Sequence, residues 1–351
     1  MPTIQEIMRT ANDAGASDVH ITVGIPPKMR VNGNLVTMEY PKMLPQDTLT
    51  VAYSIMNDAQ RERFEERGEY DMSFSIPELG RYRVNVYKQR GSAALALRLV
   101  GTVVPAPEKL GVPESVINLY ERKRGLILVT GPTGSGKSTT LAAIIDKINN
   151  NRDAHVITLE DPIEYLHQHK MAMVNQREIG LDSQSYANAL RAALREDPDV
   201  ILVGEMRDFE TISVAITAAE TGHLVLSTLH TIGAASTVDR VIDVFPPHQQ
   251  QQIRVQLANV LEAVVSQQLI PTMDGAGRVA AFEVMHANHA VRNLIREGKS
   301  HQLASVMQTN RKMGMMTMDD AIIQLFYEGK IDREMAIQFA QDPDGMQTKV
   351  I

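Results

Sequence analysis

The sequence of 351 residues predicts two domains, of which the larger, C-terminal one is an α/β domain built on a parallel sheet. Near-continuous apolar runs alternate there with helical patterns, and such runs are typical of strands buried on both faces of a sheet. The first hundred residues instead predict a small sheet with helices at its side. A Pro-rich break separates the two patterns, so we expect domains at 1–104 and 113–351, joined by a linker at 105–112.

The N-terminal domain is expected to consist mostly of short strands, each bounded by Gly or Pro. The pattern predicts strands at 19–23, 28–31, 35–39, 70–76, 81–87 and 93–100, and a helical stretch over 46–67. The pair Asn32-Gly33 suits a hairpin turn between the second and third strands. In the fifth strand, the period of two puts Arg81 and Arg83 on the face opposite the apolar side chains.

The C-terminal domain is expected to alternate strands and helices as far as residue 229 and then to become mainly helical from His248 onward. Strands are predicted at 126–130, 154–159, 200–203 and 223–229, with helices at 138–148, 186–195 and 209–221. A Met-rich segment at 313–318 could form a soft partner surface, but loose filling of a core is the interpretation that we prefer.

The composition excludes several classes of protein. Without cysteine there can be no disulfide framework, no thiolate zinc site and no cysteine nucleophile. The net charge is −7, and residues 1–105 carry 12 basic and 12 acidic side chains, so the excess acid lies in the C-terminal part. That balance argues against a nucleic-acid partner, which usually needs a basic face. No apolar run approaches the roughly 20 residues of a membrane helix. Because the first 14 residues are also unlike an export signal, we expect a soluble cytoplasmic protein.

A phosphate-binding loop is the clearest motif. Residues 131–138 fit G-x-x-x-x-G-K-[ST] at every fixed position, between an apolar strand and a helix. Glycines let successive N–H groups face a phosphate, and the helix N-terminus adds partial positive charge. Lys137 should reach the β- and γ-phosphates, and Ser138 should ligate Mg²⁺. The expected nucleotide-binding residues are Gly131, Pro132, Thr133, Gly134, Ser135, Gly136, Lys137, Ser138 and Thr139.

Four acids follow the ends of predicted strands, where ligands sit in open α/β sheets. Glu205 comes just after the strand at 200–203 and is our choice for the group that activates the attacking water. Glu160, Asp161 and Glu164 cluster after another strand and could place the nucleophile. Glu160 and Asp161 are also expected to bind Mg²⁺ through water, in addition to the Ser138 hydroxyl. The alternative is that the Asp-Pro step at 161–162 is only a turn.

Two histidines bracket the last predicted strand. His223 and His230 are seven residues apart, so they should face opposite ways and lie more than about 20 Å apart, which argues against one shared metal ion. Each is either a hydrogen-bonding surface group or a sensor of phosphate charge. The sequence leaves both interpretations open, and we keep both histidines as catalytic candidates. His167 and His169 are expected in an exposed loop.

Taken in order, these motifs resemble those of the ring-forming secretion ATPases, and within them the PilT-type retraction ATPases of type IV pili. Residues 17–21 resemble the family's S-D-[LV]-H signature, and residues 160–164 resemble its Asp box. Gly204-Glu205 resembles its atypical Walker B motif, and residues 221–230 resemble its His box. The resemblance covers nearly the whole chain.

One further segment resembles a motif that separates retraction motors from assembly motors. Residues 290–297 read Ala-Val-Arg-Asn-Leu-Ile-Arg-Glu, against A-I-R-N-L-I-R-E in the family, with Val291 in place of isoleucine. On the residues alone, this segment is an amphipathic helix that packs through one face. The tail after Gln341 matches no clear family pattern.

The resemblance implies a fold and an assembly. Each subunit would pair a PAS-like α+β N-terminal domain with a RecA-like ATPase domain that carries a helical C-terminal extension, and six copies would form a ring. ATP with Mg²⁺ would lie between the domains, completed by arginines from the N-terminal domain or a neighbouring subunit. Arg81 and Arg83 fit that role, since a guanidinium matches a phosphate that gains charge during transfer. Arg98 and Arg278 are reserves, and an ordinary surface position is the alternative.

The resemblance further implies a Mg²⁺-dependent ATPase that powers pilus retraction, by pilin depolymerisation, and twitching motility. Its partners would be copies of itself and the pilus platform protein, at the cytoplasmic face of the inner membrane. One rival is a pilus-assembly or type II secretion ATPase, although many of those carry a four-cysteine zinc module that this chain lacks. A nucleic-acid motor on the same fold and a nucleotide-binding regulator with negligible turnover are the others.

Overall fold

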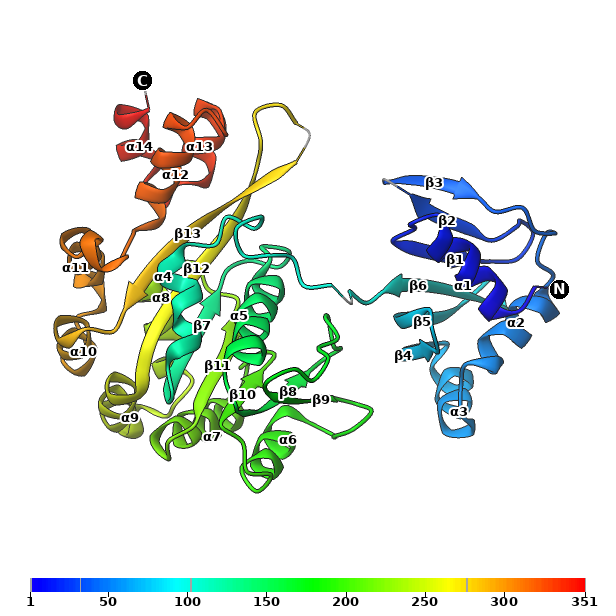
Figure 1. Cartoon of the computed structure of the whole chain (residues 1–351), viewed down its shortest axis with the longest axis horizontal. Helices are drawn as coiled ribbons and strands as arrows, with labels where there is room; N and C mark the ends of the chain where they lie inside the picture. Colours follow the sequence, from blue (N-terminus) through cyan, green and yellow to red (C-terminus); the bar gives the residue numbers. More distant parts are fainter. Residues whose placement is uncertain (1, 32, 102, 276, 351) are drawn as a thin grey trace. The chain divides into compact units, whose positions relative to one another are not determined.

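The structure, a computed structural model, describes residues 2–31, 33–101, 103–275 and 277–350. The chain divides into two compact units, residues 1–102 and 103–351 (Figure 1). The division falls two residues before the expected end of the first domain. Within the described residues, no helix combines the length and the apolar character needed to cross a membrane.

The first unit is a 6-stranded antiparallel sheet in the order β3-β2-β1-β6-β5-β4, with three helices at its side. Its elements are α1 (Ile4–Asp13), β1 (Asp18–Ile21), β2 (Lys28–Val31), β3 (Asn34–Thr37), α2 (Pro45–Ser54), α3 (Asp58–Arg67), β4 (Glu69–Ile76), β5 (Gly80–Gln89) and β6 (Ser92–Leu99). The helical stretch expected over 46–67 is two helices, because Asn57 starts a new one with a capping box to Gln60.

The alternation predicted for β5 is present. Tyr82, Val84 and Val86 are buried, whereas Arg83 is exposed and Arg81 is half-buried. At the turn between β2 and β3, Gly33 has a φ of +82°, in the region that glycine favours. Asn32, the other half of the predicted turn, lies outside the described residues.

The second unit holds a 7-stranded sheet in the order β13-β12-β7-β11-β10-β8-β9, in which β12 and β13 pair antiparallel and the other neighbouring strands pair parallel. Its strands are β7 (Gly125–Thr130), β8 (His155–Glu160), β9 (Met173–Glu178), β10 (Val200–Val203), β11 (Leu224–Leu229), β12 (Leu261–Pro271) and β13 (Arg278–His286). Its helices are α4 (Glu114–Ile117), α5 (Lys137–Asn151), α6 (Tyr186–Ala193), α7 (Phe209–Glu220), α8 (Ala234–Asp243), α9 (Pro247–Val260), α10 (His289–Arg296), α11 (Leu303–Thr309), α12 (Met318–Tyr327), α13 (Arg333–Phe339) and α14 (Pro343–Lys349), with short 3₁₀ turns at Asn118–Glu121, Ser300–Gln302 and Arg311–Met313. The α/β fold class is thus confirmed.

The prediction that the chain is mainly helical from His248 onward is wrong in one part. The strands β12 and β13 form a long hairpin there, visible in yellow in Figure 1. The helix α9 ends at Val260 and β12 begins at the next residue, so no Gly or Pro marks the change. The chain after β13 is helical, as predicted.

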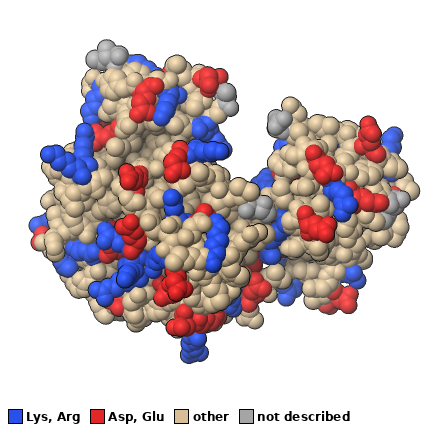
Figure 2. All heavy atoms as spheres, viewed as in Figure 1, with Lys and Arg blue, Asp and Glu red and all other residues tan. Residues whose placement is uncertain are grey.

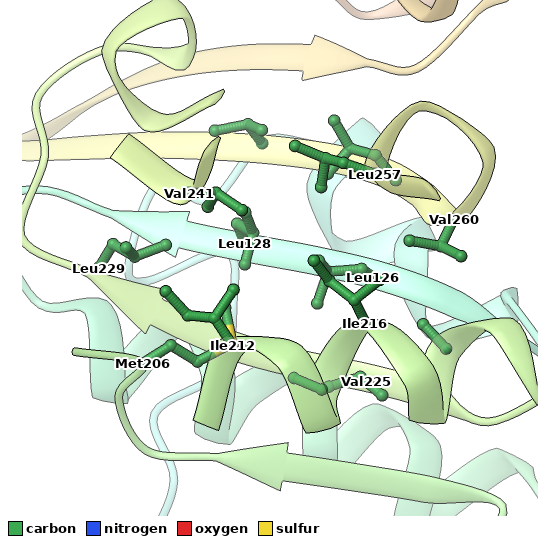
Figure 3. Close-up of a cluster of buried hydrophobic side chains, with 14 of the residues drawn as sticks. Leu126, Leu128, Met206, Ile212, Ile216, Val225, Leu229, Val241, Leu257 and Val260 are labelled. Carbon is green, nitrogen blue, oxygen red and sulfur yellow. The ribbon is translucent and has the colours of Figure 1, made fainter. Parts of the chain in front are cut away.

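The sheet carries a hydrophobic layer on each face. Leu126 and Leu128 of β7 point toward α7 and α9, and Figure 3 shows them packed against Ile216 and Leu257. The alternate residues Ile127 and Val129 point the other way, toward α5. Each fully buried aliphatic side chain contributes about 1.5–3 kcal/mol. The sheet is therefore held rigidly from both sides, and so are the strand ends that carry the motifs.

The last three helices form a smaller core of their own on the hairpin. Met318 and Ile322 of α12 pack against Ile270 of β12 and Ala281 of β13. In the Met-rich segment, Met315 and Met318 are buried and Met316 packs against this core, while Met313 is 57% exposed, so core filling describes all of them but Met313. Figure 2 shows basic and acidic side chains interspersed over the visible face of the second unit, residues 103–351.

Candidate active site

The predicted motifs meet at one edge of the parallel sheet. Gly131 directly follows β7, His230 follows β11, and Glu205 lies two residues after β10, while Glu160 ends β8. The strands β7, β11, β10 and β8 are consecutive neighbours and run parallel, so their carboxyl ends share an edge. This is the edge at which open α/β sheets bind ligands.

The phosphate loop is pressed closely against β12. Gly131 has a φ of +141°, and a Cβ placed on it would lie 2.2 Å from the carbonyl oxygen of Gln267. Gly136, the residue that caps α5, has a φ of +88°, and its Cβ would lie 2.9 Å from Nε2 of Gln267. Thr140 of α5 donates to Oε1 of the same glutamine at 2.7 Å, with both side chains buried. Gln267 therefore holds the loop against β12, and it was not predicted because it lies in the hairpin that the sequence analysis missed.

Lys137 folds back into the loop. Its Nζ donates to the carbonyl oxygens of Gly131 and Pro132, each at 2.9 Å, and the residue is only 8% exposed. Burial lowers the pKa of Lys137, while the negative charge of Glu205 acts in the opposite direction. A phosphate oxygen accepts a stronger hydrogen bond than a neutral carbonyl does, so the ammonium group is suited to transfer onto a nucleotide phosphate.

The loop also fits a nucleotide with Mg²⁺. The hydroxyl of Ser135 is buried and has no hydrogen-bond partner among the described residues, and a phosphate oxygen could accept a hydrogen bond from it. Ser138 is exposed at the N-terminus of α5, where its hydroxyl can reach a metal ion bound to the phosphates. Pro132, Thr133 and Gly134 are exposed on the same loop. Among the described residues, no group of three or more His, Asp or Glu could hold a metal ion by itself.

Glu205 and His230 face one another beside this loop. Nε2 of His230 lies 3.4 Å from Oε2 of Glu205, and the Glu205 side chain is 20% exposed. Arg207 also reaches this carboxylate, with Nε 2.7 Å from the same oxygen. The sequence identified Glu205 and His230, whereas Arg207 was missed. His230 and Arg207 thus orient the Glu205 carboxylate, which is still accessible to water.

Tyr186, at the start of α6, is a second residue that the sequence did not reveal. Its hydroxyl lies 2.8 Å from the position that a Cβ on Gly204 would occupy, so only glycine fits beside it. Burial, followed by the negative charges of Glu205, Asp161 and Glu160, raises the pKa of Tyr186. A neutral phenol hydroxyl therefore lies among the acids, able to donate a hydrogen bond.

The acids after β8 are unequally placed. Glu160 accepts hydrogen bonds from Thr158 Oγ1 at 2.7 Å and Gln176 Nε2 at 3.2 Å, and from the backbone N–H of Glu164 at 3.3 Å. Burial raises the pKa of Glu160. Asp161 and Glu164 are exposed. The cluster is thus a structured turn anchored on Glu160, with two acids that face solvent. Near it, Thr139 shares a 3.2 Å hydrogen bond with Tyr165.

Other predicted residues lie away from this edge. His223 precedes β11, at the opposite end of the strand from His230, and its Nδ1 lies 2.9 Å from the carbonyl oxygen of Ala218. It secures the end of α7, so the structure does not bring this candidate together with the phosphate loop, Glu205 and His230. His167 is half-buried rather than exposed, and burial lowers its pKa. Arg81 and Arg83 lie on β5 of the first unit.

Comparison with known proteins identifies the family. A family model described as type II/IV secretion system protein matches residues 1–291. The type IV pilus retraction ATPase PilT of Pseudomonas aeruginosa is 48% identical, over 97% of this chain and 99% of its own. A twitching motility protein of Neisseria gonorrhoeae is 47% identical, over 98% of this chain and 92% of its own. The chain belongs to the pilus retraction ATPases of the type II/IV secretion family.

A solved structure agrees with this assignment. A crystal structure of the pilus retraction motor PilT with bound ADP has a TM-score of 0.92 and 49% identity, over 98% of this chain and 99% of that one. The retraction ATPase described here therefore has the predicted fold, activity and function in twitching motility. The site at the sheet edge is its candidate catalytic centre.

Proposed function

We propose that six copies of this chain form a ring that hydrolyses ATP with Mg²⁺ at the cytoplasmic face of the inner membrane. Through the pilus platform protein, the ring would withdraw pilin subunits and so shorten the pilus. The observation that carries the proposal is the meeting of the phosphate loop, Glu205 and His230 at one sheet edge. Full-length similarity to retraction ATPases supports the direction of the work.

In the proposed reaction, the backbone N–H groups of the loop and Lys137 hold the phosphates of ATP. Glu205 takes a proton from a water molecule, whose oxygen attacks the γ-phosphorus. The bond from that phosphorus to the β–γ bridging oxygen breaks, and ADP and inorganic phosphate leave. His230 orients the carboxylate, and Arg207, whose Nε lies 2.7 Å from Oε2, must move away before that oxygen can accept a proton from water.

Mg²⁺, when bound, would neutralise charge on the β- and γ-phosphate oxygens. The Ser138 hydroxyl would hold it directly, and Glu160 and Asp161 would do so through water. Arg81 and Arg83 would complete the site, from the same subunit or from a neighbour. Their support is their shared face on β5, away from the buried side chains of that strand.

The test of the proposal is a strain from which the gene for this chain is deleted. Loss of retraction should leave an excess of surface pili together with lost twitching, restored by the parental gene. Cells without pili would instead show that the chain drives assembly. Purified protein at nucleotide saturation should sediment as a hexamer, and a monomer under those conditions would contradict the ring.

A further inference from the structure

Glu283 of β13 is a buried carboxylate that the proposed reaction does not use. The residue is 2% exposed, and its hydrogen-bond partners in the described part of the chain are two backbone N–H groups and one amide. Its Oε1 accepts the backbone N–H of Ala234 at 2.5 Å, and its Oε2 accepts the backbone N–H of Met318 at 3.1 Å. Gln341 adds a weaker contact from Nε2 at 3.4 Å.

The two N–H groups belong to the first residues of two different helices. Ala234 begins α8, and Met318 begins α12. Helix N-termini carry partial positive charge and N–H groups without partners in the helix, and the Glu283 carboxylate accepts one such N–H group from each of the two helices. Glu283 thereby joins the last helical unit of the chain to a helix of the ATPase core.

The end of α8 that Glu283 holds is continuous with the active site. Only three residues separate His230 from Ala234. Ser266, the register partner of Glu283 on β12, accepts the N–H of Gly233 at 3.0 Å. The neighbouring strands β12 and β13 therefore bind neighbouring residues, Gly233 and Ala234, just after His230. Farther along α8, Thr237 contacts Thr130, the residue just before the phosphate loop, at 3.4 Å.

The other end of the connection is equally firm. Met316, two residues before α12, pairs with Val284 of β13 through two backbone hydrogen bonds of 2.8 and 3.0 Å. Asp319 of α12 accepts the N–H groups of Gln341 and Asp342, at 2.7 and 3.2 Å. A shift of the C-terminal helices would therefore act directly on Met318 and, through Glu283, on Ala234.

We propose that Glu283 is a positioning residue: by joining the first turns of α12 and α8, it lets the C-terminal helices set the place of His230 beside Glu205. The inference rests on the proposed site of those two residues. It predicts that ATP turnover responds to Glu283, although the side chain does not touch the reacting atoms.

The test compares Glu283→Ala and Glu283→Gln with Ile148→Ala, a control that opens a cavity near the far end of α5 without touching the network. We expect Glu283→Ala to lower kcat about tenfold while KM for ATP stays within about threefold, since the phosphate loop remains. Glu283→Gln should be intermediate, because its amide offers one acceptor oxygen instead of two. Ile148→Ala should lose stability and keep its kcat.

Two further measurements are needed: the first separates positioning from mere stabilisation, and the second tests the connection between the two helix ends. In a His230→Ala background, Glu283→Ala should lower kcat by less than twofold, since the group that it positions is already gone. Amide exchange should increase together in residues 230–236 and 317–320 for both Glu283 variants, a readout that needs only folded protein. A parental kcat in Glu283→Ala, a multiplied loss in the double variant, or exchange that rises in one segment alone would overturn the proposal. A parental rate in Glu205→Ala would instead overturn the proposed site, while the exchange result would still decide on the connection.

Discussion

Gly131→Ala tests whether the close approach of the phosphate loop to β12 is required for activity. The added Cβ would lie 2.2 Å from the backbone oxygen of Gln267, whereas real contacts of this kind are not shorter than about 3.0 Å. The loop and β12 would therefore have to separate by about 0.8 Å, and neither backbone can rotate away as a side chain could. Such overpacking costs about 1–3 kcal/mol, and the φ of +141° adds about 1–2 kcal/mol of strain for a residue other than glycine.

The expected result is a loss of about 2–5 kcal/mol of stability and a fall in kcat of about a hundredfold, because a displacement near 1 Å misplaces the phosphates. Steady-state phosphate release at saturating ATP measures kcat, and urea unfolding measures stability. Gly68→Ala is the matched control, since Gly68 has a φ of +82° and no atom of the described residues lies within 4 Å of an added Cβ. It should lose about 1–2 kcal/mol and keep the parental kcat. A parental kcat in Gly131→Ala, or an equal loss of kcat in both variants, would refute the argument.

Four further variants test the site. Glu205→Ala should lower turnover at least about a hundredfold yet retain nucleotide in equilibrium dialysis; turnover at the parental rate would rule out Glu205 as the base. Thr140→Val should cost about 1–3 kcal/mol in urea unfolding, because it leaves the buried amide oxygen of Gln267 without a donor; an unchanged midpoint would show that the bond is dispensable. Glu160→Gln should gain stability relative to the parent as pH rises. Burial raises the pKa of Glu160, so the parent loses the stability of its protonated form as the pH rises through that pKa. A difference in melting temperature that does not depend on pH would contradict this. Arg83→Ala should lower kcat without changing the melting temperature, since the side chain is exposed; a parental kcat would remove it from the site.

The parts of the site that could be predicted are those encoded locally. The phosphate loop needs its glycines and lysine at fixed spacing, and the apolar runs before residues 131, 205 and 230 place all three at strand ends. The parallel sheet then brings these ends together without further information. The separation of His223 from His230 also followed from their spacing, because the two residues lie at opposite ends of β11.

The parts that could not be predicted depend on packing between distant segments. The hairpin β12–β13 was missed because polar residues interrupt its apolar pattern. These polar side chains form hydrogen bonds to segments outside the hairpin. Gln267 braces the phosphate loop, and Glu283 holds two helices. Tyr186 reaches the acids only because α6 packs beside β8 and β10. No local sequence pattern carries this information.

The central claim is that hydrolysis at the Glu205 site drives pilus shortening, and imaging of single labelled pili tests it most directly. In cells that lack the parental gene, expression of the Glu205→Gln variant should allow pili to extend but leave them unable to retract, whereas expression of the parental chain should restore retraction. Pili that shorten at the parental speed with Glu205→Gln as the sole copy would contradict this claim.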